Sequence, residues 1–181
     1  NNDGMTKSDD IDNADVLFVN TCTIRENADD KLYGTLGHLK KWKSLSPNRR
    51  LLVGGCAAQK DKELVRERAP WVDVVIGTHN TTEIINLLNQ AEDWGPITEI
   101  IEETTDIETE IAAVRESSVS AFVTIQIGCN NSCTFCIVPS VRGIEISRRP
   151  SDIINEIKSL AHDGVKAVSY THLRAHETVS Y

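Results

Sequence analysis

The fold is decided by the stretch Val16-Leu17-Phe18-Val19-Asn20-Thr21-Cys22 and by its counterpart Leu51-Leu52-Val53-Gly54-Gly55-Cys56. Each begins as a short apolar run, which predicts a buried strand, and each reaches a cysteine a few residues after that run. Residues 72–76, which are apolar except for Asp73, form a third such run. Helix-forming segments follow all three runs, and this strand–helix alternation with short connections predicts a doubly wound parallel α/β sheet.

Capping signals and apolar periodicity mark the helix-forming segments. In the first, Thr23 and Glu26 have the spacing of a capping box, and apolar residues then recur at helical intervals. In the second, Asp61 is expected to cap a helix that Pro70 ends. The third helix is expected from residues 81–82 through Leu88.

Cys22 and Cys56 occupy corresponding positions after the first and second strands. In a parallel sheet, the loops that follow the strands share one edge, and ligands bind there. We therefore expect the two cysteines to lie at the same edge, where they could share a ligand. The alternative is two independent buried cysteines, which pack as small hydrophobic residues.

The composition is that of a globular protein. Of the 181 residues, 40% are hydrophobic and 25% are charged, which argues against a disordered chain. No apolar run approaches the roughly 18 residues that span a bilayer, and no secretory signal is visible, so no membrane association is expected. The chain begins at Asn1 rather than Met, so a leader or a longer segment is expected to precede it. Five cysteines suit a disulfide framework poorly and favour metal-binding or catalytic roles in a reducing cytoplasm.

Charge is segregated along the chain, although the whole sequence carries a net charge of −8. Residues 1–15 and 98–118 are acidic, with net charges of −4 and −6, whereas residues 25–68 carry +5. A basic segment between acidic ones could contact an anionic polymer such as a nucleic acid. The favoured alternative is that these charges lie on solvated helix faces, the usual place for Lys and Arg.

The sequence predicts two domains. Residues 1–90 form the first, and residues 91–118, which are acidic and interrupted by Trp94-Gly95-Pro96, are expected to be a linker or a poorly formed hairpin. In the second domain, from 119 to 168, an alternating strand at 121–127 precedes a cysteine-rich loop. A helix follows from Pro150, with one apolar face formed by Ile153, Ile154, Ile157, Leu160 and Ala161, and it ends near Gly164. A last strand at 165–168 completes a βαβ unit, the seed of a partial (β/α) barrel.

The loop contains three cysteines within eight residues: Cys129, Cys133 and Cys136. Cysteine thiolates are the main ligands of iron–sulfur clusters. Three ligands would leave one iron of a four-iron cube open to a substrate or co-substrate, as suits a catalyst rather than an electron carrier. Zinc is the competing metal, but a structural zinc needs a fourth protein ligand, and the next candidate after Cys136 is His162.

Three blocks of sequence occur in the order seen in the radical S-adenosylmethionine (SAM) methylthiotransferases, a family that the chain resembles from about Asp12 to Val168. The blocks are Asn20-Thr21-Cys22-Thr23-Ile24-Arg25-Glu26-Asn27-Ala28, Gly54-Gly55-Cys56-Ala57-Ala58-Gln59 and Cys129-Asn130-Asn131-Ser132-Cys133-Thr134-Phe135-Cys136-Ile137-Val138-Pro139-Ser140-Val141-Arg142-Gly143. Each block alone is weak or moderate evidence, but the three together are highly specific.

The resemblance implies two 4Fe–4S clusters and SAM as cofactors. Cys129, Cys133 and Cys136 match the catalytic triad of ligands for the radical-SAM cluster, whose open iron would chelate SAM and yield a 5′-deoxyadenosyl radical. Cys22 and Cys56 match two of the three ligands of an auxiliary cluster that is involved in supplying sulfur. The residues that the resemblance also assigns to cofactor binding are Phe135, Arg142 and Gly143. From charge alone, Arg142 and Arg148 are equally consistent with an anion contact and with a solvated loop.

Within the family, the chain looks most like the members that add a methylthio group to C2 of N6-isopentenyladenosine next to the anticodon of tRNA. The implied partners are tRNA, an electron donor such as a flavodoxin-like reductant, and a sulfur source. The alternatives are members that act on threonylcarbamoyl-adenosine in tRNA or on a ribosomal-protein aspartate, and a non-catalytic iron–sulfur or zinc-binding module.

The sequence also departs from the family pattern. The third auxiliary-cluster cysteine is absent, and the chain is expected to begin after it and after the first strand. Further barrel strands and an RNA-binding domain are also absent, so the 181-residue chain alone is expected to be inactive. Residues 169–181 do not follow the family and repeat Val-Ser-Tyr, so they are expected to be a non-native tail, in which a zinc pair of His172 and His176 is improbable.

Overall fold

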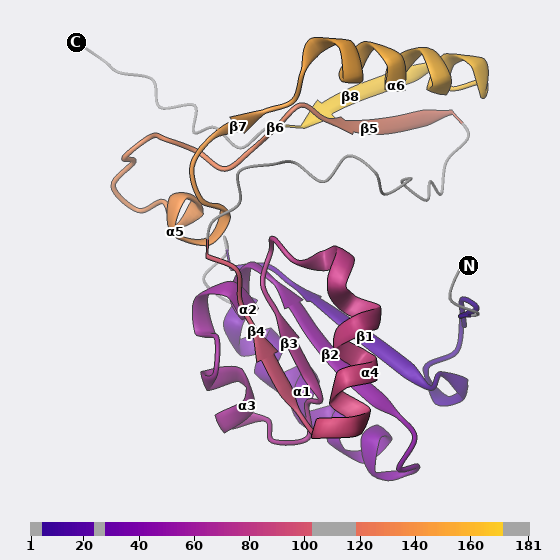
Figure 1. Cartoon of the computed structure of the whole chain (residues 1–181), viewed down its shortest axis with the longest axis vertical. Helices are drawn as coiled ribbons and strands as arrows, with labels where there is room; N and C mark the ends of the chain where they lie inside the picture. Colours follow the sequence, from indigo (N-terminus) through magenta and orange to yellow (C-terminus); the bar gives the residue numbers. More distant parts are fainter. Residues whose placement is uncertain (1–4, 24–27, 103–118, 172–181) are drawn as a thin grey trace. The chain divides into compact units, whose positions relative to one another are not determined.

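The computed structural model describes residues 5–23, 28–102 and 119–171 (Figure 1). The chain divides into two units, residues 1–102 and residues 103–181. Each unit has its own core, so each is described by itself.

The first unit is built on a parallel sheet. Its strands are β1 (Val16–Thr21), β2 (Arg50–Gly55), β3 (Val74–Ile76) and β4 (Ile97–Glu99), and they lie in that order (Figure 1). Parallel pairing places the carboxyl ends of all four strands at one edge of the sheet. The predicted parallel α/β fold is therefore confirmed.

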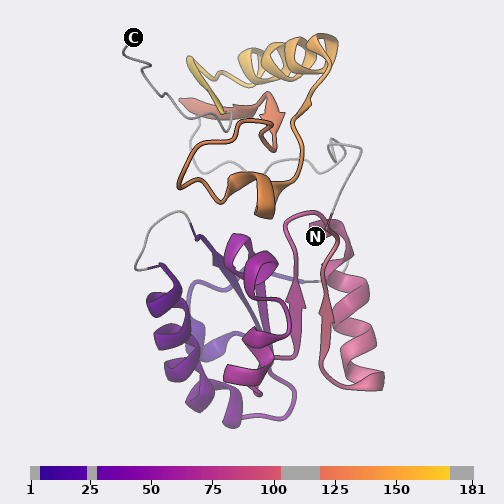
Figure 2. The ribbon, with the colours of Figure 1, turned by 90° about the vertical axis from the view of Figure 1, so that its left-hand side faces the viewer.

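Helices cover both faces of this sheet (Figure 2). On one face lie α1 (Ala28–Ser44), α2 (Cys56–Asp61) and α3 (Leu64–Arg68), and on the other lies α4 (Ile84–Trp94). Short 3-10 turns at Ile11–Asn13 and Thr81–Glu83 precede β1 and α4.

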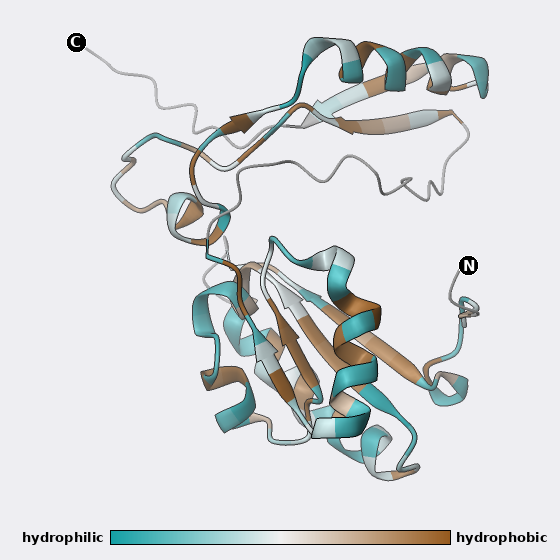
Figure 3. Ribbon diagram, in the orientation of Figure 1, coloured by the Kyte–Doolittle hydropathy of each residue, from teal (hydrophilic) through white to brown (hydrophobic). Residues whose placement is uncertain are grey.

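Alternation along β2 explains the two layers. Leu51 and Val53 face the core that α1, α2 and α3 cover, whereas Leu52 faces the core that α4 covers. All three side chains are fully buried, and the strands stand out as hydrophobic ribbon in Figure 3. Burial on both faces explains why this strand is a continuous apolar run rather than an alternating one.

The helix expected to start at Asp61 is wrong in its boundaries. Helix α2 already begins at Cys56 and ends at Asp61, and a second helix, α3, begins at Leu64. Lys62 separates them with a φ of 51°, a left-handed conformation that interrupts the helical hydrogen bonds. The consequence is that Cys56 is the first residue of a helix rather than part of a loop.

The linker also begins later than expected. Helix α4 continues through Trp94, and β4 pairs with β3 through Val74↔Ile97 and Ile76↔Glu99. Residues 91–99 therefore belong to the first unit. The short strand β4 is stabilised by pairing with β3, which lies more than 20 residues earlier in the sequence. Residues 103–118, the rest of the expected linker, lie outside the described residues.

The second unit contains the expected βαβ arrangement. Strand β5 (Ser120–Thr124) pairs in parallel with β8 (Ala167–Thr171), and α6 (Pro150–His162) lies between them in sequence. A small antiparallel pair, β6 (Gln126–Ile127) with β7 (Ile146–Ser147), frames the cysteine-rich loop. That loop contains one short helix, α5 (Val138–Arg142).

The core of the second unit is small. Ala121, Val123 and Leu160 form it, and Ile153 packs against it. The apolar face expected for α6 is only partly buried, because Ile154 and Ile157 are 51% and 37% exposed. Two strands offer too little surface to cover the whole face. Gly164 has a φ of 92°, which confirms it as the residue that ends α6.

Two boundary features complete the description. Strand β8 runs through Thr171, so the first three residues of the expected non-native tail pair with β5, while residues 172–181 lie outside the described part. No helix in the described ranges has the length and apolar character needed to cross a membrane.

Candidate functional site

The carboxyl edge of the first sheet brings two cysteines together in register. Thr21 pairs with Gly55 across β1 and β2, and each is followed directly by a cysteine. Cys22 is exposed, whereas Cys56 is buried at 4% exposure. The expectation that Cys22 and Cys56 share one edge of the sheet is met, although they differ in access to solvent.

The turn from β2 into α2 is tight. Gly55 has a φ of 96°, and a Cβ atom there would lie 2.5 Å from the carbonyl oxygen of Thr21. Glycine is required at this position for both reasons. The Thr21 hydroxyl donates a hydrogen bond of 2.6 Å to the Gly54 carbonyl and accepts the N–H groups of Ala57 and Ala58 at 3.1 and 3.3 Å.

The other end of α2 is held by charged groups. Lys60 forms an ion pair with Asp29 of α1 and a second, of 3.3 Å, with Asp61. The hydroxyl of Tyr33 donates a hydrogen bond of 2.6 Å to Asp61. Helix α2, which begins with Cys56, is therefore tied to α1 at its last turn, and Thr23, next to Cys22, also reaches Asp29 at 3.4 Å.

These contacts shift two pKa values upward. Burial raises the pKa of Tyr33 most, and the hydrogen bond and negative charge of Asp61 raise it further. For Lys60, burial opposes the charged form, but the carboxylates of Asp29 and Asp61 outweigh it and raise the pKa. Lys60 therefore stays charged and Tyr33 stays neutral near pH 7.

A buried amide connects α2 to the neighbouring strand ends. Gln59 is 4% exposed; its Oε1 accepts the N–H of Thr78 at 2.9 Å, and its Nε2 donates to the carbonyl of Ile101 at 3.0 Å. Asn80, 1% exposed, donates to the carbonyl of Glu99 at 2.9 Å. Gly77 lies beside them, and a Cβ there would lie 2.2 Å from Gln59 Oε1, so a larger residue would displace this amide.

Sequence reasoning missed the structural roles of Thr21, Gln59 and Asn80. The available signals were weak: Thr21 is a short polar residue at a strand end, and Gln59 lies one helical turn after Cys56. Neither signal identifies a partner, because the partners lie at sequence separations of 19 to 42 residues.

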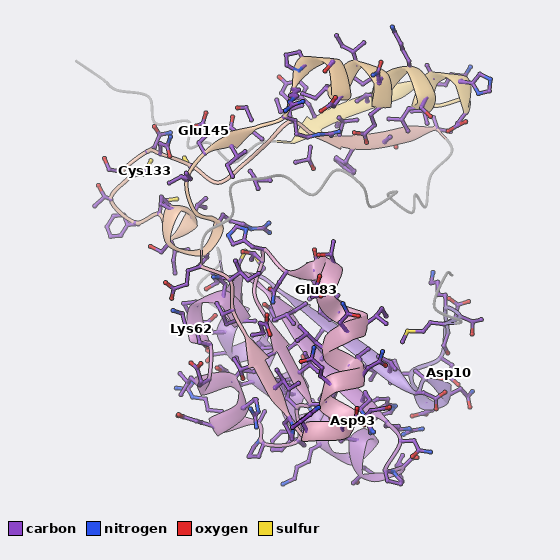
Figure 4. The ribbon with its side chains drawn as sticks, in the orientation of Figure 1. Asp10, Lys62, Glu83, Asp93, Cys133 and Glu145 are labelled. Atoms are coloured by element: carbon purple, nitrogen blue, oxygen red, sulfur yellow. The ribbon has the colours of Figure 1, made fainter. Side chains whose placement is uncertain are left out.

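The loop between β6 and β7 carries the other three cysteines, of which Figure 4 labels Cys133. Its base is closed by the pair Ile127↔Ile146 and by a hydrogen bond of 3.1 Å from the Cys129 N–H to the Gly143 carbonyl. Gly128 has a φ of 67°, and a Cβ there would lie 1.9 Å from the Ile144 carbonyl oxygen. The two ends of the loop are therefore in close backbone contact.

The three thiols differ in exposure. Cys129 is buried at 4% exposure, Cys133 is half-buried and Cys136 is exposed. A turn joins the last two, with the Cys136 N–H donating to the Cys133 carbonyl at 3.2 Å. Asn130 braces the loop from its other side by accepting the Glu145 N–H at 2.9 Å.

The donor set suits an iron–sulfur cluster in its chemistry. None of the five cysteines forms a disulfide, and thiolates are the preferred ligands of such clusters. However, within the described residues no three Cys, His, Asp or Glu side chains are gathered closely enough to bind a metal ion. The assignment of Cys129, Cys133 and Cys136 to one cluster therefore remains a prediction.

The other predicted cofactor-binding residues lie on the same loop. The side chain of Phe135 is 99% exposed, Arg142 is the last residue of α5, and Gly143 follows with a φ of 72°. Arg148 has a structural partner instead of a solvated position: it forms an ion pair of 2.6 Å with Glu156 of α6. Its guanidinium also donates to the Thr124 carbonyl at 2.8 Å, so it joins α6 to β5.

The basic segment 25–68 is largely used inside the first unit. Lys43 pairs with Asp73 at 2.7 Å, and Arg50 pairs with Glu92 at 3.4 Å. Three further cations lie over aromatic rings, at 4.8 to 5.0 Å from the ring centroids: Lys40 over Trp71, Arg49 over Trp42 and Arg68 over Tyr33. These five residues therefore make contacts within the first unit. The contacts support neither of the two roles expected for them, a solvated helix face or a nucleic-acid surface.

A pocket of about 500 Å³ lies elsewhere in the first unit. Residues 5–11 and 13–18 line it, so it lies along the amino-terminal half of β1, away from Cys22. No predicted site residue contributes to this pocket.

The fold and the cysteines together define an α/β domain with two thiols at the carboxyl edge of its sheet, followed by a βαβ unit with a three-cysteine loop. Residues 1–77, within the first unit, match the model of the uncharacterized protein family UPF0004.

Named proteins are similar to the chain over most of its length. It is 50% identical to the tRNA-2-methylthio-N(6)-dimethylallyladenosine synthase of Mycolicibacterium smegmatis over 157 aligned residues. These aligned residues make up 86% of the chain and 31% of that protein. It is 49% identical to the Cutibacterium acnes protein of the same name over 164 aligned residues, and these make up 90% of the chain and 33% of that protein. The corresponding protein of Mycobacteroides abscessus is 48% identical over 167 residues, 92% of the chain and 33% of its own length.

These relatives confirm the resemblance to methylthiotransferases. The chain spans about a third of the length of the curated relatives it matches. The similarity includes most of both units, because 86–92% of the chain is aligned and the remainder is shorter than half of either unit.

Proposed function

We propose that the chain forms about a third of a tRNA methylthiotransferase, which adds a methylthio group to C2 of N6-isopentenyladenosine. The similarity of about 50% to proteins named for this product supports the proposal. The structural observation that carries it is the register pair Thr21↔Gly55, which places Cys22 and Cys56 at adjacent strand ends in the UPF0004 domain. The reducing cytoplasm, where tRNA is found, is the proposed location.

In this proposal, each group of cysteines holds one 4Fe–4S cluster. Cys129, Cys133 and Cys136 bind three irons of the first, and Cys22 and Cys56 supply two ligands of the second. When bound, the clusters and SAM supply the electron transfer and radical chemistry that no side chain performs alone. An electron donor and a sulfur source complete the proposed set of partners.

The remaining residues have supporting roles. The tight backbone closure at Gly128 and Gly143 fixes the ends of the cysteine loop. The exposed ring of Phe135 is available to cover SAM, and the guanidinium of Arg142 is the proposed partner for its carboxylate, since arginine suits carboxylates in geometry and charge. The exposed thiol of Cys22 and the buried thiol of Cys56 would supply two ligands of the second cluster.

The test is anaerobic reconstitution of the chain with iron and sulfide, followed by metal and sulfide analysis. We expect about four irons and four sulfides to depend on Cys129, Cys133 and Cys136, and a change in the electron paramagnetic resonance spectrum on adding SAM. Replacing the three cysteines by serine should abolish both signals, whereas replacing the exposed Ser140 by alanine should leave them unchanged.

A zinc-binding module is the competing function. One bound zinc and no sulfide after reconstitution would exclude the enzyme and support the module. Iron and sulfide that do not respond to SAM would support a non-catalytic iron–sulfur protein instead.

A further inference from the structure

Helix α2 lacks a cap of its own. Its first residue is Cys56, and the preceding residue, Gly55, has no side chain to accept the free N–H groups of the first turn. The first four N–H groups of a helix have no partner inside the helix, and a buried one that stays unpaired is costly. Ala57 and Ala58 are both fully buried, so water does not replace a cap here.

Thr21 supplies the missing cap from the neighbouring strand. Its Oγ1 accepts the N–H groups of Ala57 and Ala58 at 3.1 and 3.3 Å, and donates to the Gly54 carbonyl at 2.6 Å. A hydroxyl offers one donor and two acceptor sites, so all of its hydrogen-bonding capacity is used. An ordinary cap precedes its helix in the chain, whereas this one is 36 and 37 residues away from the groups that it caps.

The arrangement links the two cysteines through one side chain. Thr21 is bonded covalently to Cys22, and its hydroxyl holds the residue that follows Cys56. We infer that Thr21 is a positioning residue that sets the spacing of Cys22 and Cys56 for a shared metal centre. This inference rests on the proposed function for the identity of that centre, but the spacing itself is a property of the chain without any cluster.

Three substitutions separate the hydroxyl from the rest of the side chain. Thr21→Val keeps the shape and removes the hydroxyl, and Thr21→Ser keeps the hydroxyl and removes the methyl group. Thr98→Val is the matched control: Thr98 lies in β4 of the same sheet, and its buried hydroxyl has no hydrogen-bond partner among the described residues.

Amide hydrogen exchange in the full cluster-free chain gives the first measurement. In Thr21→Val we expect exchange at Ala57 and Ala58 to accelerate about 2- to 30-fold, the equivalent of losing a helix cap. Thr21→Ser and Thr98→Val should exchange at these two residues as the unchanged chain does. Unchanged exchange in Thr21→Val would overturn the inference.

Binding of Cd²⁺ gives the second measurement and reports on the two thiols directly. In a background with Cys129, Cys133 and Cys136 replaced by serine, Cd²⁺ can bridge only Cys22 and Cys56, and thiolate charge-transfer absorption follows its binding. We expect Thr21→Val to weaken Cd²⁺ binding about tenfold, as the loss of an outer contact to metal ligands does, and Thr21→Ser to restore it. Equal affinities for Thr21→Val and the unchanged background would overturn the positioning role.

If Thr21→Val fails to fold, the Thr21→Ser chain shows whether the hydroxyl or the methyl group of Thr21 is responsible. A folded Thr21→Ser chain with normal Cd²⁺ affinity supports the hydroxyl, and a Thr21→Ser chain that also fails assigns the effect to the methyl group and overturns the inference. Neither measurement involves iron, sulfide, SAM or tRNA. The positioning role of Thr21 can therefore be supported or overturned independently of the proposed function.

Discussion

The backbone N–H of Thr78 donates a hydrogen bond of 2.9 Å to Oε1 of Gln59, which joins the end of β3 to the helix that begins with Cys56. The same amide reaches the carbonyl of Ile101 after β4. One side chain therefore holds three parts of the sheet edge in place.

Replacing Gln59 by alanine should destabilise the first unit. The change removes both hydrogen bonds of the buried Gln59 amide, to the Thr78 N–H and the Ile101 carbonyl, and leaves a cavity where the side chain was, at a cost of about 2–4 kcal/mol. Urea unfolding followed by tryptophan fluorescence measures this, because Trp42, Trp71 and Trp94 all lie in the first unit. The exposed Gln90 of α4 provides the control, and equal losses for Gln59→Ala and Gln90→Ala would contradict the prediction.

Replacing Gly128 by alanine should disrupt the cysteine-rich loop. The new Cβ would lie 1.9 Å from the Ile144 carbonyl oxygen, and the φ of 67° adds its own strain, so the loss should reach about 3 kcal/mol or more. Gly164→Ala is the control, with a φ of 92° but no atom within 4 Å, and should cost only about 1–2 kcal/mol. Hydrogen exchange read by mass spectrometry on peptides of the second unit distinguishes the two, and similar exchange in both variants would refute the steric argument.

Removing the hydroxyl of Tyr33 should change how stability depends on pH. The pKa of Tyr33 is raised in the folded chain, so its contribution is fully present below the unfolded pKa of about 10 and is lost as pH rises above it. Tyr33→Phe should therefore be less stable by about 1–2 kcal/mol at pH 8, with a difference that shrinks above pH 10. Urea unfolding at several pH values from 8 to 11 measures this. A constant difference over that range would show that the hydroxyl does not titrate as inferred.

Lys43→Met should destabilise the first unit more than a comparable change at the surface. The Lys43 ammonium lies 2.7 Å from both carboxylate oxygens of Asp73, and both side chains are less than 20% exposed. Removing the ammonium leaves a largely buried carboxylate without its counter-ion, which should cost about 2–4 kcal/mol. By contrast, Lys7 pairs with Asp9 at 3.7 Å with both side chains more than 80% exposed, so Lys7→Met should have little effect. Tryptophan-detected urea unfolding of the two variants compares them, and a negligible loss for Lys43→Met would contradict the prediction.

Most of the first sheet could be predicted from its sequence, because β1, β2 and β3 are apolar runs buried by helices. The shared edge of Cys22 and Cys56 followed from parallel pairing alone. Strand β4 was missed because only three residues pair, and the pattern around Trp94 and Gly95 resembles a loop. The break at Lys62 has no local signal either, since lysine rarely adopts a positive φ.

For the candidate site, the sequence suggests which thiols could be ligands, because the donor atoms belong to the motif itself, and that assignment stays a prediction. The sequence does not indicate the contacts that hold those residues in place. The contacts of Thr21 and Gln59 depend on where distant strands end, and no local pattern encodes them. The gathering of Cys129, Cys133 and Cys136 around one cluster stays a prediction, as does the origin of residues 169–181.

The spacing of Cys22 and Cys56 depends on the ladder between β1 and β2 and on the Thr21 hydroxyl at its end, and not on the chain that joins the two strands. Residues 45–49, which connect α1 to β2, therefore tolerate insertions in evolution or engineering without moving either thiol, provided that the contacts of Arg49 are kept. A single inserted residue within β1 or β2 would shift one cysteine by a whole step against the other. The number of residues between the two cysteines can thus change while the relative position of their thiols stays the same.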